Sequence, residues 1–321
     1  MRYARHPLWR TSALAILALL AGGAPRLVRA EGALASSLPT RAAAVDADGY
    51  IDPDQLVEHF GSELARIAKE YQIVVPEELA RQAEQARAFA VKTLPDPGRP
   101  LRPDEIYAAA RPCTVLVGAI GDHDPHHGPQ RFCATGFVIH PDGIIATNYH
   151  LFPGFRTLKA VGVMAADGRV WPVKQILAAD PAGDVAVLKI DAQGLPALPV
   201  AADVRVGQRV FCLSHPVLDS DRSSSGLFAF TQGMVSGKYR LRLGEETPIK
   251  VLTITADYAV GSSGGPILNE HGAVVGVACQ TSPIVYDLQA NDVQMVWKLS
   301  RPSSTLLALL KGPGQAVAAK E

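Results

Sequence analysis

The sequence predicts a mainly β domain preceded by helices, on the basis of two patterns. From Pro112 onward, short apolar runs alternate with turn residues such as Pro141-Asp142-Gly143, which is typical of short strands in a sandwich or in barrels. Before Pro112, apolar residues recur at helical spacing. The 321 residues, of which 48% are hydrophobic, suffice for one large domain or two modest ones.

The strand candidates are seven apolar runs bounded by turn residues. A short helix is predicted directly before them at 104–110, and a closing helix after them at 306–310. The seven runs are 114–120, 134–139, 144–147, 185–190, 210–213, 251–255 and 274–278.

Two amphipathic helices are predicted before the β region. The first can begin with Asp52 as its N-cap and Pro53 at its first position, and the second begins at Pro76. We interpret the pair as a helical hairpin whose apolar stripe is its own packing surface; the alternative is docking onto the following domain or a partner. The stripes are Leu56, Phe60, Leu64, Ile67 and Tyr71 in the first helix and Leu79, Ala83, Ala86 and Ala90 in the second.

Composition divides the chain into four regions. Residues 1–30 are predicted to be a secretory signal, because arginines precede a short apolar run and Val28-Arg29-Ala30 has the small-residue pattern of a cleavage site. Residues 31–102 comprise a flexible lead, the helical hairpin and a linker stiffened by closely spaced prolines. The β domain is predicted at 103–310, and a disordered tail at 311–321.

The predicted signal implies export to the periplasm or the medium. Its apolar run is too short to span a membrane, so no stable membrane span is expected after cleavage; an uncleaved anchor is the alternative. Cleavage would remove five arginines and no acidic residue, which leaves 26 basic against 31 acidic residues and a net charge of −5. This charge argues against nucleic acid as a partner.

Four cysteines remain in the exported chain: Cys113, Cys133, Cys212 and Cys279. They can pair in three ways in an oxidising compartment, and buried unpaired thiols are an equal alternative. None belongs to a CxxC motif, so the spacing does not favour a structural zinc site.

The segment GSSGGP, from Gly261 to Pro266, is either a turn or the loop of an accessible nucleophile. A serine nucleophile needs a base to take its proton and a third group to hold that base. Both residue types occur in suitable places. His150 follows an apolar run that ends in a polar turn, and Asp184 directly precedes the apolar run at 185–190. These neighbours favour the catalytic interpretation of Ser263.

Three sequence blocks, TGFVIHPDGIIATNYH, DPAGDVAVLKI and GSSGGPI, resemble the motif blocks of chymotrypsin-fold serine proteases. They are most similar to the bacterial trypsin-like branch that includes the HtrA/Deg proteases, and the order His, Asp, Ser is that of this fold. The resemblance covers about 112–310. It implies two six-stranded antiparallel β-barrels with the active site in the cleft between them, and no cofactor.

The resemblance also assigns roles to residues. It makes Ser263 the nucleophile, His150 the general base and Asp184 the group that orients the base. The backbone N–H groups of Gly261 and Ser263 would form the oxyanion hole. A strand that pairs with the substrate backbone is expected at Val277, Ala278, Cys279, Gln280 and Thr281.

Asp257 lies six residues before Ser263. In trypsin-like enzymes this position forms the floor of the primary pocket, where an acid attracts lysine or arginine. HtrA-type chains instead carry an aspartate eight residues before the serine, without tryptic specificity, and both interpretations stay open. Two further departures from the HtrA pattern are Ser262 in place of asparagine and only a short tail where a PDZ module follows in that family.

Two other features have plainer interpretations. The stretch GDHDPHHG offers His123, His126 and His127 with two aspartates, but it lies between strand candidates and is interpreted as a solvated hairpin loop, so no metal site is predicted. Asp180 is interpreted as a turn residue, and His215 as a loop residue near the site.

Together these features predict an exported serine endopeptidase that acts on peptides or proteins. The alternatives are a non-catalytic peptide-binding pseudoprotease and a serine esterase.

Overall fold

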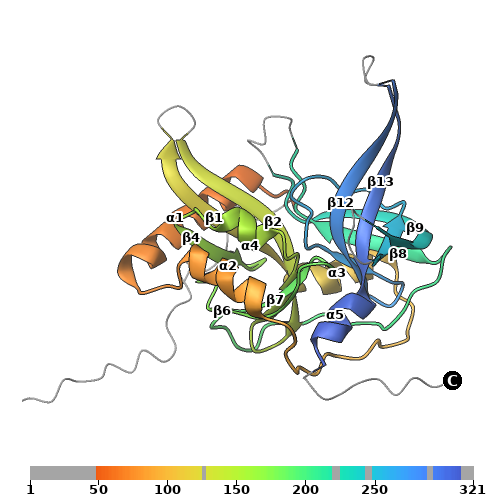
Figure 1. Cartoon of the computed structure of the whole chain (residues 1–321), viewed down its shortest axis with the longest axis horizontal. Helices are drawn as coiled ribbons and strands as arrows, with labels where there is room; N and C mark the ends of the chain where they lie inside the picture. Colours follow the sequence, from red (N-terminus) through yellow and green to blue (C-terminus); the bar gives the residue numbers. More distant parts are fainter. Residues whose placement is uncertain (1–47, 125–127, 219–224, 243–247, 288–291, 312–321) are drawn as a thin grey trace, which may run out of the picture. The chain divides into compact units, whose positions relative to one another are not determined.

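The computed structural model describes residues 48–124, 128–218, 225–242, 248–287 and 292–311 (Figure 1), all of which belong to one compact unit. The predicted signal sequence, most of the flexible lead, His126 and His127 of the proposed hairpin loop, and the tail beyond Lys311 lie outside the described residues. These four predictions therefore stay predictions. In the described part of the chain, no helix combines the length and hydropathy that crossing a bilayer requires.

The N-terminal half of the β region is a seven-stranded antiparallel sheet with strand order β5-β4-β1-β2-β3-β7-β6. Strands β1 and β2 near its middle are long, and the edge strand β5 has only three residues. The strands are β1 (Thr114–Asp124), β2 (Gly128–His140), β3 (Ile144–Thr147), β4 (Ala160–Met164), β5 (Val170–Pro172), β6 (Gln175–Asp180) and β7 (Val185–Lys189).

The C-terminal half is a closed antiparallel barrel with strand order β10-β13-β12-β11-β8-β9. Figure 1 shows β12 and β13 running side by side as a long hairpin (blue), in agreement with their extended pairing. The strands are β8 (Arg209–Ser214), β9 (Ala229–Leu241), β10 (Ile249–Ile254), β11 (Pro266–Leu268), β12 (Val274–Asp287) and β13 (Asp292–Pro302).

The predicted mainly β class with two antiparallel halves is confirmed, and the C-terminal barrel has the expected six strands. The N-terminal sheet has seven strands instead of six. The additional short strand β5 pairs Val170 and Trp171 with β4, and it ends at Pro172, which cannot donate to a further ladder. All seven predicted strands are present.

Helix α1 (Pro53–Glu70) begins as predicted, with Asp52 accepting a hydrogen bond from the backbone N–H of Gln55 at 2.9 Å. Its apolar stripe does not pack against α2 (Pro76–Gln85). Instead, α1 lies on β1, β4 and β5, and α2 lies on β6 and on the short helix α4 (Leu151–Phe155). The two helices therefore dock separately on the N-terminal sheet, and the interpretation of the stripe as the hairpin's own surface is wrong.

The packing of Phe60 shows how closely α1 fits the sheet. Phe60 is fully buried in the same core cluster as β-strand residues. Its ring lies against Gly118 of β1, where an added Cβ would come within 2.8 Å of the ring. Glycine at this position of the strand thus makes room for the helix side chain.

The segment after α2 runs extended along the rest of the molecule. Phe89 and Val91 donate backbone hydrogen bonds to carbonyls at the end of helix α5 (Ser303–Leu309), and Leu101 donates to Glu270. Asp96 accepts hydrogen bonds from Asn269 and His271. The proline-rich segment is therefore attached at several points; the domain boundaries at 102 and 310 stay predictions.

All four cysteines are free thiols. Cys113 and Cys212 are buried, whereas Cys133 and Cys279 are partly exposed. Burial raises the pKa of the Cys113, Cys133 and Cys212 thiols to about 12. Of the two alternatives left open by the sequence, this structure has the unpaired thiols.

We expect Phe60→Ala to lower the free energy of unfolding by about 3–5 kcal/mol, because the truncation leaves a cavity between α1 and β1. Urea denaturation followed by circular dichroism measures this change. Tyr71→Ala, at a position 41% exposed beyond the end of α1, serves as the control. A loss below about 1 kcal/mol in Phe60→Ala would show that α1 is not part of the cooperative core.

Candidate active site

His150 and Asp184 lie next to each other because β3 and β7 are antiparallel neighbours. Thr147, the last residue of β3, pairs with Ala186 near the start of β7. His150, three residues past the end of β3, therefore lies beside Asp184, which directly precedes β7. The buried side chain of Asn148 reinforces this contact by donating to the carbonyl of Asp184 at 2.7 Å.

The His150 imidazole and the Asp184 carboxylate form a hydrogen-bonded pair. Nδ1 of His150 lies 2.9 Å from Oδ2 and 3.1 Å from Oδ1 of Asp184, and the His150 backbone N–H donates to Oδ1 at 2.9 Å. A carboxylate only accepts, so Nδ1 carries the proton and Nε2 presents its lone pair. The His150 side chain is 46% exposed, so this lone pair belongs to an accessible imidazole.

The environment keeps the Asp184 carboxylate ionised. Burial by itself would raise the pKa of this carboxyl, but hydrogen bonds from His150, the attraction of its imidazole when protonated, and a hydrogen bond from Cys279 hold the pKa below its ordinary value. Asp184 also has φ of +49°, a left-handed conformation that non-glycine residues rarely adopt. Such backbone strain is concentrated at functional positions.

The Ser263 loop is built on glycines that approach neighbouring backbone. Gly261 has φ of +90°, and a Cβ there would lie 2.4 Å from the carbonyl oxygen of His215. Gly264 has φ of +86°, and a Cβ there would lie 2.0 Å from the carbonyl oxygen of Thr135. Neither position can hold a side chain without moving backbone.

Thr135 of β2 joins this loop to the N-terminal sheet. Its N–H donates to the carbonyl of Ser263 at 2.9 Å, and its hydroxyl donates to the carbonyl of Gly261 at 3.0 Å. The same hydroxyl accepts from the His215 N–H at 3.0 Å. The loop is thus fixed relative to the sheet that carries His150 and Asp184.

Ser262, which replaces the asparagine of the HtrA pattern, is fully buried. Its hydroxyl accepts from the hydroxyl of Ser214 at 2.9 Å. Of the two adjacent serines, Ser263 is the one with partial exposure.

Cys279 links the serine to the aspartate. Its carbonyl accepts a hydrogen bond from the Ser263 hydroxyl at 3.1 Å, and its thiol donates to Oδ2 of Asp184 at 2.8 Å. Burial raises the pKa of the Cys279 thiol, and the neighbouring Asp184 charge raises it further, so this group is a protonated donor. The sequence placed Cys279 only in the substrate-pairing strand, and no local signal revealed the direction of its thiol.

The structure therefore gathers the three predicted residues around Cys279. It does not join Ser263 directly to His150: among the described residues, the Ser263 hydroxyl donates to the Cys279 carbonyl and not to Nε2 of His150. Hydrogen bonds between nucleophile and base are often formed only when substrate is bound. The N–H groups of Gly261 and Ser263 have no acceptor in the part of the chain that the structure describes.

The predicted substrate strand is only partly available. The N–H of Ala278 donates to Gly265 and its carbonyl accepts from Gly264, and Val277 lies between β11 and β13. The backbone groups of Ala278 are therefore engaged within the barrel. Beyond them, Gln280 and Thr281 pair with β13 only.

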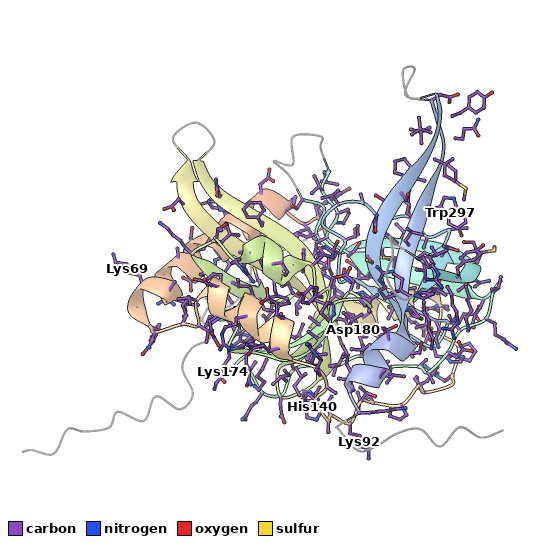
Figure 2. The ribbon with its side chains drawn as sticks, in the orientation of Figure 1. Lys69, Lys92, His140, Lys174, Asp180 and Trp297 are labelled. Atoms are coloured by element: carbon purple, nitrogen blue, oxygen red, sulfur yellow. The ribbon has the colours of Figure 1, made fainter. Side chains whose placement is uncertain are left out.

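Asp257 is not a free acid. Its Oδ1 lies 2.6 Å from Nζ of Lys298, which also donates to the carbonyl of Tyr258 at 2.6 Å. The Asp257 side chain is 80% exposed, whereas that of Lys298 is only 14% exposed. Both residues line a pocket of about 410 Å³ together with Trp297 of β13 (Figure 2).

The remaining candidates have structural roles. Asp180, at the end of β6 (Figure 2), accepts from the backbone N–H of Gly183 at 2.9 Å, as expected of a turn residue. His215, interpreted as a loop residue near the site, lies directly after β8 and is fully buried. Its Nδ1 accepts from the Phe228 N–H at 3.0 Å, and its Nε2 has no partner among the described residues.

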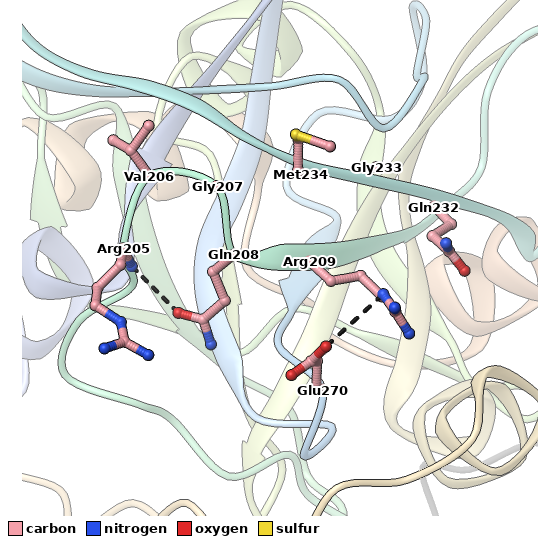
Figure 3. Close-up of a pocket in the computed structure, with 9 residues that line it drawn as sticks. All are labelled: Arg205, Val206, Gly207, Gln208, Arg209, Gln232, Gly233, Met234 and Glu270. Carbon is pink, nitrogen blue, oxygen red and sulfur yellow. Dashed lines mark hydrogen bonds and ion pairs between the residues drawn. The ribbon is translucent and has the colours of Figure 1, made fainter.

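A larger pocket, of about 870 Å³, lies on the C-terminal barrel (Figure 3). It contains no predicted site residue, and its charged groups Arg209 and Glu270 lie 3.7 Å apart. Its other lining residues supply no nucleophile with an adjacent base, so size alone does not make it the active site. They are Arg205, Val206, Gly207, Gln208, Gln232, Gly233 and Met234.

Comparison with known proteins agrees with this geometry. Residues 134–277 match the family described as the trypsin-like peptidase domain. The chain is 34% identical over 160 residues to a probable periplasmic serine endoprotease DegP-like from Halomonas elongata, covering 48% of this chain and 31% of that protein. It is 30% identical over 203 residues to protease Do-like 5, chloroplastic, from Arabidopsis thaliana, covering 55% of this chain and 59% of that protein.

The solved structure of the HtrA-type protease AlgW with a tripeptide has the same fold, with a TM-score of 0.50 and 22% identity over 65% of this chain and 62% of that one. The chain is thus similar to the trypsin-like peptidase domain over residues 134–277 and to HtrA-type serine proteases, and it shares the fold of AlgW. It spans about one third to three fifths of the length of these curated relatives.

The buried His215 predicts a pH-dependent stability. Burial lowers its folded-state pKa from 6.5 to about 3, so folding favours the neutral ring. Its contribution is complete above pH 6.5 and is lost as pH falls toward 3, at about 1.4 kcal/mol per pH unit. We expect the wild-type free energy of unfolding to fall between pH 7 and pH 5 by roughly 2 kcal/mol more than that of His215→Asn, whose amide oxygen can replace Nδ1 as acceptor.

Urea denaturation of both proteins at the two pH values measures the difference. Any difference in the free energy of unfolding between the two proteins at pH 7 cancels, because only the change between pH 7 and pH 5 is compared. An equal decrease in the free energy of unfolding of both proteins would mean that the pKa of His215 is the same in the folded and unfolded states.

Proposed function

We propose that the protein is a serine endopeptidase that hydrolyses peptide bonds through Ser263, His150 and Asp184. The observation that carries the proposal is the hydrogen-bonded His150–Asp184 pair, linked through Cys279 to a partly exposed serine in a glycine-built loop. The homology to serine proteases supports the same reaction class.

The reaction requires the Ser263 hydroxyl to leave the Cys279 carbonyl. Rotation about χ1 of Ser263 would move its hydroxyl from the Cys279 carbonyl toward Nε2 of His150. Nε2 then takes the proton while Oγ attacks the peptide carbonyl, and the resulting oxyanion accepts hydrogen bonds from the N–H groups of Gly261 and Ser263. The absence of a described acceptor for these two N–H groups supports this role.

The second half of the reaction reverses the proton transfer. His150 gives the proton to the leaving amine, which departs and leaves an acyl ester on Ser263. Water then attacks this ester while Nε2 takes a proton from the water, and the imidazolium returns that proton to Oγ as the carboxylic acid product leaves. Asp184 stays ionised and stabilises the imidazolium in both halves.

Export is part of the proposal. Relatives described as periplasmic support a periplasmic location for the chain, in agreement with the predicted signal at 1–30. The chloroplastic and mitochondrial names of other relatives show that the fold also serves other compartments.

We expect Ser263→Ala and His150→Ala each to lower kcat/KM for a peptide substrate by at least about 1,000-fold, and the double variant to be little worse than either, because the residues act as a unit. A fluorophosphonate probe should label the wild type and not Ser263→Ala, which separates an enzyme from a non-catalytic binding module. Parallel peptide and ester substrates separate a peptidase from an esterase.

Ser62→Ala, on the exposed face of α1, is the matched control and should label normally. Circular dichroism verifies that all variants fold. Near-normal turnover in Ser263→Ala would rule out the proposed nucleophile.

The Lys298–Asp257 ion pair argues against cleavage after basic residues. We expect wild-type rates for substrates with Arg or Val at the cleaved position to differ by less than about threefold, because Lys298 neutralises the acid. Lys298→Met frees the carboxylate and should raise the Arg-to-Val ratio of kcat/KM by about tenfold or more. The added change Asp257→Asn should abolish this gain. A strong Arg preference in the wild type would contradict the neutralisation.

A further inference from the structure

Two protons point at one oxygen beside His150. Oδ2 of Asp184 lies 2.9 Å from Nδ1 of His150 and 2.8 Å from Sγ of Cys279. The three ligand-type atoms of these side chains all lie within 4.8 Å of one another. One imidazole nitrogen, one carboxylate oxygen and one sulfur therefore lie close together. The two hydrogen atoms between them occupy the place that a metal ion would take.

We propose that the side chains of His150, Asp184 and Cys279 bind a single Zn²⁺ ion, and that this ion inhibits the peptidase. The inhibitory part rests on the function proposed above, whereas the binding part does not. Imidazole nitrogen, carboxylate oxygen and thiolate sulfur are the three ligand types that zinc uses in proteins, and three protein ligands leave a fourth position for water.

The distances suit zinc after a rearrangement of the outer ligands. At usual bond lengths, tetrahedral zinc holds nitrogen and oxygen about 3.3 Å apart, and sulfur about 3.5 Å from either. The nitrogen–oxygen distance must therefore open by roughly 0.4 Å and the oxygen–sulfur distance by roughly 0.7 Å, whereas nitrogen and sulfur, which lie within 4.8 Å of each other, must come to about 3.5 Å. Rotation of the His150 and Cys279 side chains can supply this, since both side chains are partly exposed.

Exposure also provides the entry path. His150 has a side chain 46% exposed, so an ion can approach from the imidazole side, while Asp184 at 12% exposure holds the inner position. The Asp184 carboxylate is already ionised and supplies the negative charge that first attracts the cation.

Zinc binding would remove the general base without covering the nucleophile. The thiol loses its proton to solvent and becomes a thiolate ligand. The imidazole proton passes from Nδ1 to Nε2 through water, because Nδ1 now binds zinc. An Nε2–H cannot accept the Ser263 proton, so attack on the substrate stops.

Binding is tested in the Ser263→Ala protein, which makes the readout independent of activity. Co²⁺ is the spectroscopic probe because it shares these ligands. We expect a thiolate-to-cobalt charge-transfer band that Zn²⁺ bleaches at one equivalent. The band should be lost in Ser263→Ala/Cys279→Ser, and zinc affinity should fall at least 10-fold.

A second His–Asp pair without a thiol gives the matched control. Nδ1 of His271 lies 2.8 Å from Oδ1 of Asp96, so Ser263→Ala/His271→Gln should keep both the band and the zinc affinity. Cobalt binding without a sulfur band, or a band that survives Cys279→Ser, would overturn the site.

Inhibition is measured separately in the proteins with Ser263 intact. Each rate is expressed relative to the same protein without zinc, and Cys279→Ser should need at least 10-fold more zinc for half inhibition than the wild type. Equal sensitivity of both proteins would overturn the inhibitory role. A protein with the cobalt band and no peptidase activity would contradict the proposed function and leave the metal site standing.

Discussion

The candidate site depends on the hydrogen bond from the Cys279 thiol to the Asp184 carboxylate, because this contact joins the two halves of the molecule. Asp184 precedes β7 of the N-terminal sheet, and Cys279 lies in β12 of the C-terminal barrel. The pair His150–Asp184 belongs entirely to the sheet, and Ser263 belongs entirely to the barrel. Through Cys279, whose carbonyl also accepts a hydrogen bond from the Ser263 hydroxyl, the position of Ser263 is set relative to His150.

A second path of contacts reaches the same loop from the N-terminal helices. Phe60 of α1 packs on Gly118 of β1, β1 pairs with β2 through Leu116 and Thr135, and Thr135 holds the backbone of the Ser263 loop. Each step is either close packing or a hydrogen bond to the backbone, so a displacement of one of these elements would displace the next. The docked helices therefore stabilise the strand on which the loop rests, which is a reason for them to be packed on the sheet and not on each other.

Much of this arrangement was predictable because its signals are local. Apolar runs ended by turns predicted the strands, Asp52 and Pro53 predicted the start of α1, and the resemblance of the motif blocks assigned His150 and Asp184 to one site. The rest depends on contacts distant in sequence. Whether α1 packs on α2 or on a sheet cannot be read from its stripe, and the three-residue β5 exists only because β4 offers an edge. The direction of the Cys279 side chain follows from a register shift in β12 between Ala278 and Gln280. A one-residue shift reverses the face of the sheet that a side chain occupies. No nearby residue in the sequence signals this shift.

The Cys279 thiol can both donate a hydrogen bond to Asp184 and bind a metal ion, whereas a hydroxyl at this position would be suited only to the hydrogen bond. Burial and the Asp184 charge keep Cys279 protonated, so in the absence of a metal it acts as a weak donor and holds the carboxylate toward His150. A hydroxyl would donate at least as strongly, but it is a poor zinc ligand. The sulfur therefore adds nothing that the orientation of His150 requires. What it adds is affinity for soft cations at a place where a cation would compete directly with the Nδ1 proton. The hydrogen bond between Cys279 and Asp184 thus holds the site together, and the same two side chains are the ones through which a metal ion would disrupt it.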